Sequence, residues 1–331
     1  MTEVHDLPTP ALVVDTADFE HNLDTMAAAL PGARCRPHVK AHKTTALAHE
    51  QAARGHRAFT CATPREMIGM AKAGLGDDLL LANEVIDPDR LASLASLDAR
   101  VTIAVDSEAT IDAAARAGLR EVVIDVFVGM PRCGCAPDQA GRFADQARAR
   151  GLTVRGVMGY EGHVVGVADR ATREEQTEAA MQMLLDAHAD VGGELVSGGG
   201  TGTYDINTWV TEIQAGSYTL MDTAYGHLDL PFRQALSIVA TVISVSDGWA
   251  VADCGLKALG MDHGDPTVIG HTVWYCSDEH VTFGPGSRVA AGDRVRVWPA
   301  HIDPTVAYHE RMHLARGDDV VDTWAVDLRG W

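Results

Sequence analysis

The sequence predicts an α/β fold, a (β/α)₈ barrel followed by a C-terminal antiparallel β domain. Two patterns in the chain point to it. In roughly the first two thirds, short apolar runs rich in Val and Ile alternate with longer stretches of helical spacing rich in Ala, Arg and Glu. After about Pro231 the helical spacing disappears, and short apolar runs are separated by turn-forming residues. The first pattern is typical of βαβ units and the second of an antiparallel sheet.

The first part of the chain alternates expected strands and helices. Strands are expected at residues 58–63, 78–83, 100–106, 121–129 and 154–163. Helices are expected at residues 44–54, 64–72, 87–97, 107–117, 137–150 and 172–191. The second of these helices has the clearest ends, because Thr63 suits the N-cap, Pro64 the first helical position and Gly74 the turn beyond the last.

The βαβ repetition is compatible with a closed barrel or with an open doubly wound sheet. An open sheet that binds a dinucleotide normally carries GxGxxG at its first βα turn. The first such turn here reads RPHVKAHKT, residues 36–44, and contains no glycine. This difference favours the barrel.

The last hundred residues predict the β domain. Strands are expected at residues 235–245, 249–253, 267–269, 272–275, 287–289 and 294–299, separated by the turns SDG, DHGDP, GPGS and AGD. We therefore expect residues 1–10 to be an extension that joins the β domain, residues 11–233 to form the barrel, and residues 234–331 to form the β domain.

Composition excludes several classes of function. A net charge of −19 argues against nucleic acid or an anionic membrane surface as a partner. The chain has no apolar run of about 18 residues and no signal-peptide pattern at its start, so we expect no membrane span. Its six cysteines form no CxxC pair. Reduced thiols in a cytoplasmic protein fit this pattern best.

Lys40 is a candidate catalytic residue. It ends the expected strand 34–40, and a barrel places its catalytic groups at such strand ends. Desolvation there would lower the pKa of the amine and free it for imine formation. A salt-bridged surface lysine is the alternative, but the position between His38 and His42 favours a site. The chain contains few other lysines, namely Lys43, Lys72 and Lys257.

Two further segments carry groups that suit ligands. VSGGGTGT, residues 196–203, leads an apolar strand into three glycines and two hydroxyls, which suits a phosphate monoester, although a plain glycine-rich turn is the alternative. PAHIDPTV, residues 299–306, follows the alternating run RVRVW. If that strand continues, His301 and Asp303 share one face and suit Mn²⁺, Mg²⁺ or Zn²⁺. A hydrogen-bonded surface pair is the commoner meaning of such a spacing.

These segments together resemble a known family. RPHVKAHKT resembles the cofactor-lysine segment of the D-threonine aldolase and D-serine dehydratase family, a pyridoxal-phosphate-dependent branch of the alanine-racemase-like fold. Other segments match in kind and in the same order along nearly the whole chain. They are VGMPRCG (128–134), GYEGH (159–163), GGGTGT (198–203), EIQAGSY (212–218), DCGLKALGMDHG (253–264) and PAHIDPTV (299–306).

The resemblance implies roles for particular residues. Lys40 would carry the cofactor as a Schiff base, and Arg132 would lie against its pyridine nitrogen. Tyr160 and His163 would face the substrate. Gly200, Thr201, Gly202 and Thr203 would hold the phosphate, with Ser217 and Tyr218 close by, and His301 and Asp303 would ligate a divalent metal. Enzymes of this fold usually pair, so a homodimer is expected.

The resemblance leaves the reaction open. Family dehydratases that bind zinc have cysteine where this chain has Asp303, so the first hypothesis is an aldolase that cleaves a D-3-hydroxy amino acid, such as D-threonine or D-3-hydroxyaspartate, with Mn²⁺ or Mg²⁺ bound. His163 would take the hydroxyl proton. The alternatives are β-elimination from D-serine or a D-3-hydroxy acid, racemisation, a non-catalytic cofactor carrier, and an unrelated barrel.

The chain also departs from the aldolase pattern. In the aldolases the histidine is expected a few residues further beyond the tyrosine than in GYEGH, and the chain is expected to be longer. These differences leave the identity of the base and the substrate open. Glu161, between the tyrosine and the glycine, has two possible places, lining the site or pointing to solvent, and the second is expected.

Overall fold

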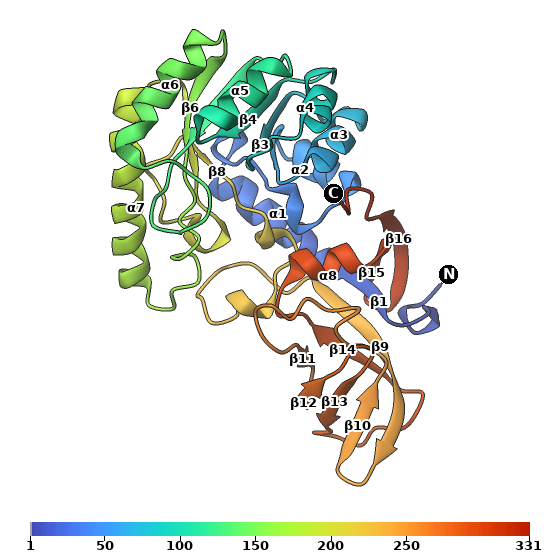
Figure 1. Cartoon of the computed structure of the whole chain (residues 1–331). Coiled ribbons are helices and arrows are strands. Elements are labelled where there is room, and N and C mark those ends of the chain that lie inside the picture. Colours follow the sequence, from blue (N-terminus) through green and yellow to red (C-terminus); the bar gives the residue numbers. More distant parts are fainter. Residues whose placement is uncertain (1) are drawn as a thin grey trace. The chain divides into compact units, whose positions relative to one another are not determined.

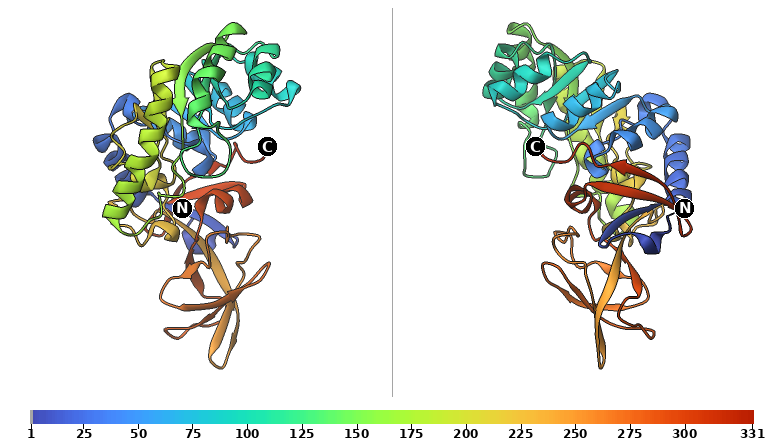
Figure 2. Two further views of the ribbon diagram at one scale, coloured as in Figure 1. Left: turned by 60° about the vertical axis from the view of Figure 1, so that its left-hand side comes forward. Right: turned by 90° about the vertical axis from the view of Figure 1, so that its right-hand side faces the viewer.

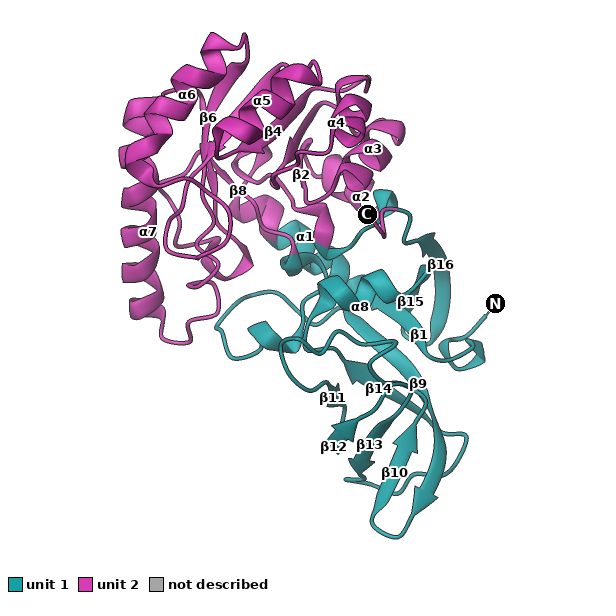
Figure 3. Cartoon of the chain, viewed as in Figure 1, with its two compact units in different colours: residues 1–25, 41–46, 217–327 teal, residues 26–40, 47–216, 328–331 magenta. Residues whose placement is uncertain are grey.

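A computed structural model describes residues 2–331, and the chain divides into two compact units (Figure 3). Unit 1 comprises Met1–Thr25, Ala41–Ala46 and Ser217–Asp327, and unit 2 comprises Met26–Lys40, Leu47–Gly216 and Leu328–Trp331. The expected boundaries at residues 11 and 234 differ from this division, because the chain crosses between the units after residues 25, 40, 46, 216 and 327.

Unit 2 contains the predicted barrel. Its seven strands are all parallel and neighbours in space follow the order of the chain (Figure 1). They are β2 (Ala58–Cys61), β3 (Asp78–Leu81), β4 (Val101–Val105), β5 (Glu121–Asp125), β6 (Thr153–Met158), β7 (Leu195–Gly198) and β8 (Glu212–Ile213).

The segment 35–38 closes this sheet. Cys35 bridges Ile213 of β8, and His38 bridges Thr60 of β2, both in parallel register. Backbone hydrogen bonds run on both sides, from Arg36 N to Ile213 O at 2.9 Å and from Thr60 N to Pro37 O at 2.9 Å. The segment therefore serves as the first stave, and the predicted barrel class is confirmed. The expected continuous strand 34–40 is wrong in detail, because 3₁₀ turns at Gly32–Arg34 and Val39–Ala41 flank the paired residues.

Helices α3 to α7 lie along the outside of the parallel strands (Figures 1 and 2). The predicted start of α3 is confirmed, because the Thr63 hydroxyl accepts a hydrogen bond from Glu66 N at 3.1 Å. The helices are α1 (Thr16–Ala29), α2 (Thr45–Ala53), α3 (Pro64–Lys72), α4 (Pro88–Ala95), α5 (Glu108–Arg116), α6 (Ala140–Ala149), α7 (Arg170–Val191) and α8 (Ile302–Tyr308). Short 3₁₀ helices also occur at Val4–Asp6, Pro137–Gln139, Thr201–Thr203, Ser217–Thr219 and Thr223–Tyr225.

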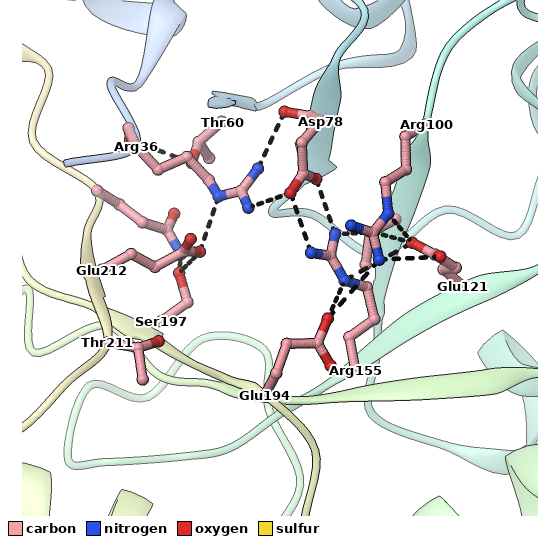
Figure 4. A network of polar contacts seen from close by, with 12 residues as sticks. Arg36, Thr60, Asp78, Arg100, Glu121, Arg155, Glu194, Ser197, Thr211 and Glu212 are labelled. Atoms are coloured by element: carbon pink, nitrogen blue, oxygen red, sulfur yellow. Dashed lines mark hydrogen bonds and ion pairs between the residues drawn. The ribbon is translucent and has the colours of Figure 1, made fainter. Parts of the chain in front are cut away.

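The barrel interior changes character from one end of the strands to the other. Apolar side chains of neighbouring strands pack together in its middle, among them Leu80, Ala104 and Val123. The N-terminal strand ends carry a buried network of ion pairs instead (Figure 4). Asp78, the first residue of β3, lies at its centre and accepts hydrogen bonds from Arg36 and Arg155, whose side chains are 1% and 3% exposed. In a barrel this end contributes to stability rather than to catalysis.

Unit 1 contains the β domain. Its nine-stranded sheet runs β12–β13–β10–β9–β1–β15–β16, and β14 pairs with both β9 and β11. The strands are β1 (Ala11–Asp15), β9 (Leu236–Ser246), β10 (Trp249–Ala252), β11 (Thr267–Val268), β12 (Thr272–Cys276), β13 (Val281–Gly284), β14 (Arg294–Trp298), β15 (Arg311–Arg316) and β16 (Asp319–Ala325). All pairings are antiparallel except that of β1 with β15.

Three sequence expectations for this domain were wrong. Residues 11–15 pair with β9 and β15 and so belong to this sheet rather than to the barrel. Residues 287–289 form no strand, whereas Val281–Gly284 forms β13. Residues 302–308 form the helix α8, so helical structure does occur after Pro231.

Within residues 2–331, no helix has both the length and the apolar character that crossing a lipid bilayer requires.

Candidate active site

The predicted residues of unit 2 lie at the C-terminal ends of the barrel strands. Lys40 is in the 3₁₀ turn η3 (Val39–Ala41), directly after the stave 35–38. Its side chain is half-buried. Its backbone nitrogen lies 3.4 Å from Nδ1 of His38. Tyr160 and His163 follow β6, and the glycine-rich turn follows β7. This is the end at which barrel enzymes build their active sites.

Tyr160 links the arginine segment to the glycine-rich turn. The guanidinium carbon of Arg132 lies 5.6 Å from the centre of the Tyr160 ring, a cation–π arrangement. On the glycine side, a Cβ added to Gly200 would lie 3.4 Å from ring carbon Cε2 of Tyr160 and 3.7 Å from its hydroxyl. Three of the predicted residues are thus held together around one aromatic ring.

His163 is held by the same arginine-bearing loop. Its imidazole is exposed to solvent and lies directly against the backbone of Gly129, whose φ is +121°. A Cβ at position 129 would come within 2.6 Å of Cε1 of His163. Only glycine permits both that backbone conformation and this close approach. The histidine therefore has a defined position and an accessible ring, as a proton-transfer group requires.

The glycine-rich turn is shaped by close backbone packing. Gly199 has a φ of +78°, in the left-handed region. A Cβ at Gly202 would lie 1.8 Å from the carbonyl oxygen of Val165, which excludes any other residue there. The side chains of Thr201 and Thr203 are buried, and the hydroxyl oxygen of Thr203 accepts a hydrogen bond from Gly200 N at 3.2 Å. The turn is thus compact and rigid.

Glu161 is the residue of this region whose expected place was wrong. Its side chain is fully buried rather than directed to solvent, and it binds the glycine-rich turn. The sequence held one signal for it, since Glu161 lies between Tyr160 and Gly162 directly after an expected barrel strand, where barrels gather site residues.

Arg132 lies near a buried acid whose pKa is raised. Asp125, the last residue of β5, Arg132 and Tyr160 line a small cavity at this end of the barrel. Burial raises the pKa of Asp125 well above its usual range, and the nearby carboxyl of Glu84 raises it further, whereas Arg132 opposes the shift.

The predicted metal ligands lie together in unit 1, but not on one face of a strand. His301 is the N-cap of α8 with an extended backbone, and Asp303 lies in the first turn of that helix. Nε2 of His301 is 3.5 Å from Oδ2 of Asp303. Burial lowers the pKa of His301, but the contacts with Asp303 and Asp262 outweigh burial and raise it.

Asp262, which was not predicted, orients this histidine. Its Oδ2 lies 2.8 Å from Nδ1 of His301, an arrangement that leaves Nε2 directed toward Asp303. The ring of His263 stacks on that of His301, with centroids 3.9 Å apart and planes 6° apart. Donor atoms of Asp262, His263 and His301 lie within 4.8 Å of one another. Parallel stacked rings direct their lone pairs along separate planes, so this geometry favours His301 and Asp303 as the pair that shares an ion.

Asp222 adds a buried carboxylate near this pair. Its Oδ2 accepts a hydrogen bond from Ile302 N at 3.0 Å, while its buried Oδ1 has no hydrogen-bond partner. Burial raises the pKa of Asp222 to about 6, and the charge of Asp303 adds to the effect of burial. A buried oxygen without a donor, beside an imidazole and a second carboxylate, is a set that suits a hard or borderline divalent cation.

Ser217 and Tyr218 lie in the 3₁₀ helix η6 (Ser217–Thr219) of unit 1. Tyr218 is fully buried, and its ring packs at 5.6 Å from that of Phe232. The packing gives Tyr218 a place in the core of unit 1. Their predicted closeness to a cofactor stays a prediction.

Two family models match consecutive parts of the chain. Residues 14–224 match "Alanine racemase, N-terminal domain", and residues 235–315 match "Putative serine dehydratase domain". The first corresponds to more than half of the chain.

Curated relatives match over nearly the full length. The chain is 33% identical over 356 residues to D-threonine aldolase of an Arthrobacter species, covering 98% of this chain and 93% of the relative. It is 33% identical over 360 residues, with the same coverage, to 3-hydroxy-D-aspartate aldolase of Paracoccus denitrificans strain Pd 1222. D-threo-3-hydroxyaspartate dehydratase of Delftia sp. strain HT23 is 26% identical over 384 residues, covering 98% of both chains.

The fold is also that of a solved aldolase. The crystal structure of D-threonine aldolase from Filomicrobium marinum superposes with a TM-score of 0.94 at 33% identity, covering 99% of this chain and 98% of the other. A solved structure of a D-threo-3-hydroxyaspartate dehydratase with a cysteine replaced by alanine, in its metal-free form, superposes with a TM-score of 0.89 at 25% identity and covers 100% of both chains.

Proposed function

Because the chain belongs to the alanine-racemase-like family that includes D-threonine aldolase, we propose that it is a pyridoxal-phosphate-dependent aldolase that cleaves a D-3-hydroxy amino acid to glycine and an aldehyde. The observation that carries the proposal is the match, at 33% identity over 98% of the chain, to relatives named for this reaction. D-threonine-like and D-3-hydroxyaspartate-like acids are the two substrate classes that these names suggest.

The residues at the barrel mouth fit the cofactor. A lysine follows the first stave, and a compact turn built of glycines and hydroxyl residues follows β7. Gly202 lies where any Cβ would fill the space beside Val165 O, as a turn that must pack closely requires. When bound, pyridoxal phosphate supplies an electron sink for the breaking Cα–Cβ bond.

We assign the steps of the reaction to residues of this chain. Lys40 would hold the cofactor, and Arg132 would supply a permanent cation at its ring nitrogen that disfavours protonation there. Tyr160 keeps Arg132 in place through its ring, at the 5.6 Å contact. His163, exposed and fixed against Gly129, accepts the proton of the substrate's β-hydroxyl.

The His301 and Asp303 pair fits a divalent cation. One nitrogen and one carboxylate oxygen lie 3.5 Å apart, close enough to contact a single ion, and Asp262 fixes the histidine ring from behind. An oxygen-rich set that includes Asp303 favours Mn²⁺ or Mg²⁺ over Zn²⁺. Such an ion lowers the pKa of a bound hydroxyl.

The dehydratase remains the second candidate. The match to the Delftia dehydratase spans 98% of both chains, so the fold by itself does not separate the two reactions. The aspartate at position 303 is what favours the aldolase, since the family's zinc-binding dehydratases are expected to have cysteine there. A racemase or a simple cofactor carrier would leave the His301 and Asp303 pair without a role.

The reaction is tested by product analysis of the purified enzyme with pyridoxal phosphate and Mn²⁺. We expect glycine and an aldehyde, or glyoxylate, from D-threonine or D-3-hydroxyaspartate. EDTA is expected to lower the rate by on the order of 10²-fold, because the bound metal lowers the activation barrier by several kcal/mol. Added Mn²⁺ should restore it. Ammonia and a 2-oxo acid, from these substrates or from D-serine, would establish the dehydratase instead.

We further propose that the protein is a cytoplasmic homodimer. All six cysteines are free, in keeping with a reducing compartment. Unit 1 exposes several large apolar side chains on β9, β10 and β12. Ile243 and Val245 are two apart on β9 and so share a face, and the rings of Trp249 and Trp274 lie 6.3 Å apart. Exposed patches of this kind mark protein contacts.

Light scattering after size-exclusion chromatography is expected to give twice the 35.3 kDa mass of the chain. Replacing the 52% exposed Trp274 by arginine should weaken the pairing at least about tenfold, since a charge would then face an apolar contact. A monomeric mass at all concentrations of the unmodified protein would refute the homodimer.

A further inference from the structure

Glu161 is a buried carboxylate that the proposed reaction leaves without a role. It follows Tyr160 in the turn after β6, and none of its side chain is exposed. Carboxylates are rarely buried unless their oxygens are satisfied by partners. Both oxygens of Glu161 are satisfied, and all the donors come from the glycine-rich turn after β7 and the residues that follow it.

Three donors converge on this carboxylate. Oε2 accepts a hydrogen bond from Gly199 N at 3.1 Å. Oε1 accepts one from the Thr203 hydroxyl at 2.8 Å and one from the Asn207 side-chain amide at 3.1 Å. A single anion thus ties the first glycines of the turn to its last threonine.

These contacts also fix the direction of the Thr203 hydroxyl. An ionised carboxylate only accepts, so the hydroxyl proton of Thr203 points to Glu161. The same oxygen then serves as acceptor for Gly200 N at 3.2 Å. Gly199 N, Gly200 N and the Thr203 hydroxyl are therefore all engaged within the turn, and they set its shape.

We propose that Glu161 is a positioning residue, which holds the turn 199–203 in the shape that receives the phosphate of the cofactor. The proposal rests on the proposed function, since that function places the phosphate at this turn. Tyr160 packs against Gly200, and Glu161 binds Gly199 and Thr203, so two successive residues of one loop hold the turn.

The charge of Glu161 distinguishes positioning from simple electrostatics. A phosphate monoester is itself an anion, so electrostatics alone would prefer a neutral glutamine at position 161. Glutamine, however, has only one acceptor oxygen, and its NH₂ would face one of the three donors. Positioning therefore predicts that Glu161→Gln weakens binding of the phosphate, whereas charge alone predicts that it strengthens binding.

The test compares two ligands on the apoenzyme, pyridoxal phosphate and pyridoxal, which lacks the phosphate. We expect Glu161→Gln to raise the dissociation constant for pyridoxal phosphate by about tenfold or more, because a buried donor loses its acceptor. The constant for pyridoxal should change by less than about twofold, within the spread of neutral substitutions. The ³¹P resonance of the bound phosphate should shift as well.

Two further variants keep the outcome clear. Asn207→Ala removes one of the three donors without touching the glutamate or any residue assigned to the phosphate, and it should give the same selective loss if Glu161→Gln folds poorly. Glu178→Gln on the exposed face of α7 is the matched control and should change neither constant.

A lower melting temperature with an unchanged ratio of the two constants would overturn the proposal, because Glu161 would then be purely structural. Tighter binding of pyridoxal phosphate by Glu161→Gln would overturn it as well. Failure of the unmodified protein to bind either compound would instead refute the proposed function.

Discussion

Replacing Lys40 by alanine is expected to abolish both the absorption of lysine-bound cofactor and the aldolase activity, with a rate loss on the order of 10³-fold or more. Lys40 lies in the turn that directly follows the stave closing the barrel, and its side chain is half-buried. Alanine at this position has no amine to bond the cofactor. The absorption spectrum of the purified protein with pyridoxal phosphate and the rate of glycine formation are the measurements.

One variant distinguishes imine formation by Lys40 from its positive charge, and a second variant is a control. Lys40→Arg keeps a cation but cannot form an imine, so it should be as inactive as Lys40→Ala. Lys72→Ala removes an exposed lysine from the last turn of α3 and should keep full activity. Retained activity in Lys40→Arg would mean that position 40 acts through its charge, and the cofactor would then have to be held elsewhere.

The barrel could be predicted because each βα unit carries its own local signal. Strand centres and helix spacing agreed with the structure to within a few residues, and at α3 the N-cap Thr63 and the bounds agreed with those predicted. The first stave could not be delimited in this way. Its pairing with Ile213 depends on a residue far along the chain. The expected strand predicted only that Lys40 lies at the C-terminal end of the barrel strands.

The β domain shows where local pattern fails. β1 has four apolar residues and Asp15, and its partners β9 and β15 lie more than 200 residues away, so nothing near it in the chain indicates its sheet. The prediction that His301 and Asp303 share one strand face was wrong, because β14 ends at Trp298 and α8 begins at Ile302. The signal for a helix was present, because Asp303 and Pro304 both suit the first turn of α8.

The candidate site was predicted by residue type but not by contact. Lys40, Tyr160 and His163 follow strand ends of the barrel, as the sequence indicated. The partners that hold site residues in place, Glu161 and Asp262, were not predicted. Each acts through a side chain that hydrogen-bonds a residue about 40 positions away. A single sequence gives no information about such distant contacts.

Asp78→Ala is expected to lower the free energy of unfolding by about 3–5 kcal/mol, because it leaves two buried guanidinium groups with one acidic partner fewer each. Oδ1 of Asp78 lies 2.7 Å from Nη1 of Arg155, and Oδ2 lies 3.0 Å from Nη2 of Arg36. Arg36 would keep Glu212 and Arg155 would keep Glu194 (Figure 4). Urea unfolding of the apoenzyme at neutral pH measures the difference.

The loss of unfolding free energy in Asp78→Ala should become smaller at acidic pH. Burial by itself raises the pKa of Asp78, but hydrogen bonds and charges of Arg155 and Arg36 outweigh it and hold the pKa well below its usual range. A carboxyl whose pKa is depressed by folding stabilises the protein fully above its unfolded pKa of about 3.9, and this contribution is lost as the pH falls further. The gap between the unmodified protein and Asp78→Ala should therefore narrow below about pH 4.

Asp77→Ala is the matched control for this prediction. The preceding residue is also an aspartate, but its side chain is 63% exposed and lies 3.5 Å from the exposed Arg57. A surface pair of this kind contributes about 0–1 kcal/mol, so its removal should change stability little at any pH. Equal losses for the two variants would mean that burial of the network adds nothing. A loss in Asp78→Ala that does not shrink in acid would show that shape, rather than the depressed pKa, makes Asp78 stabilising.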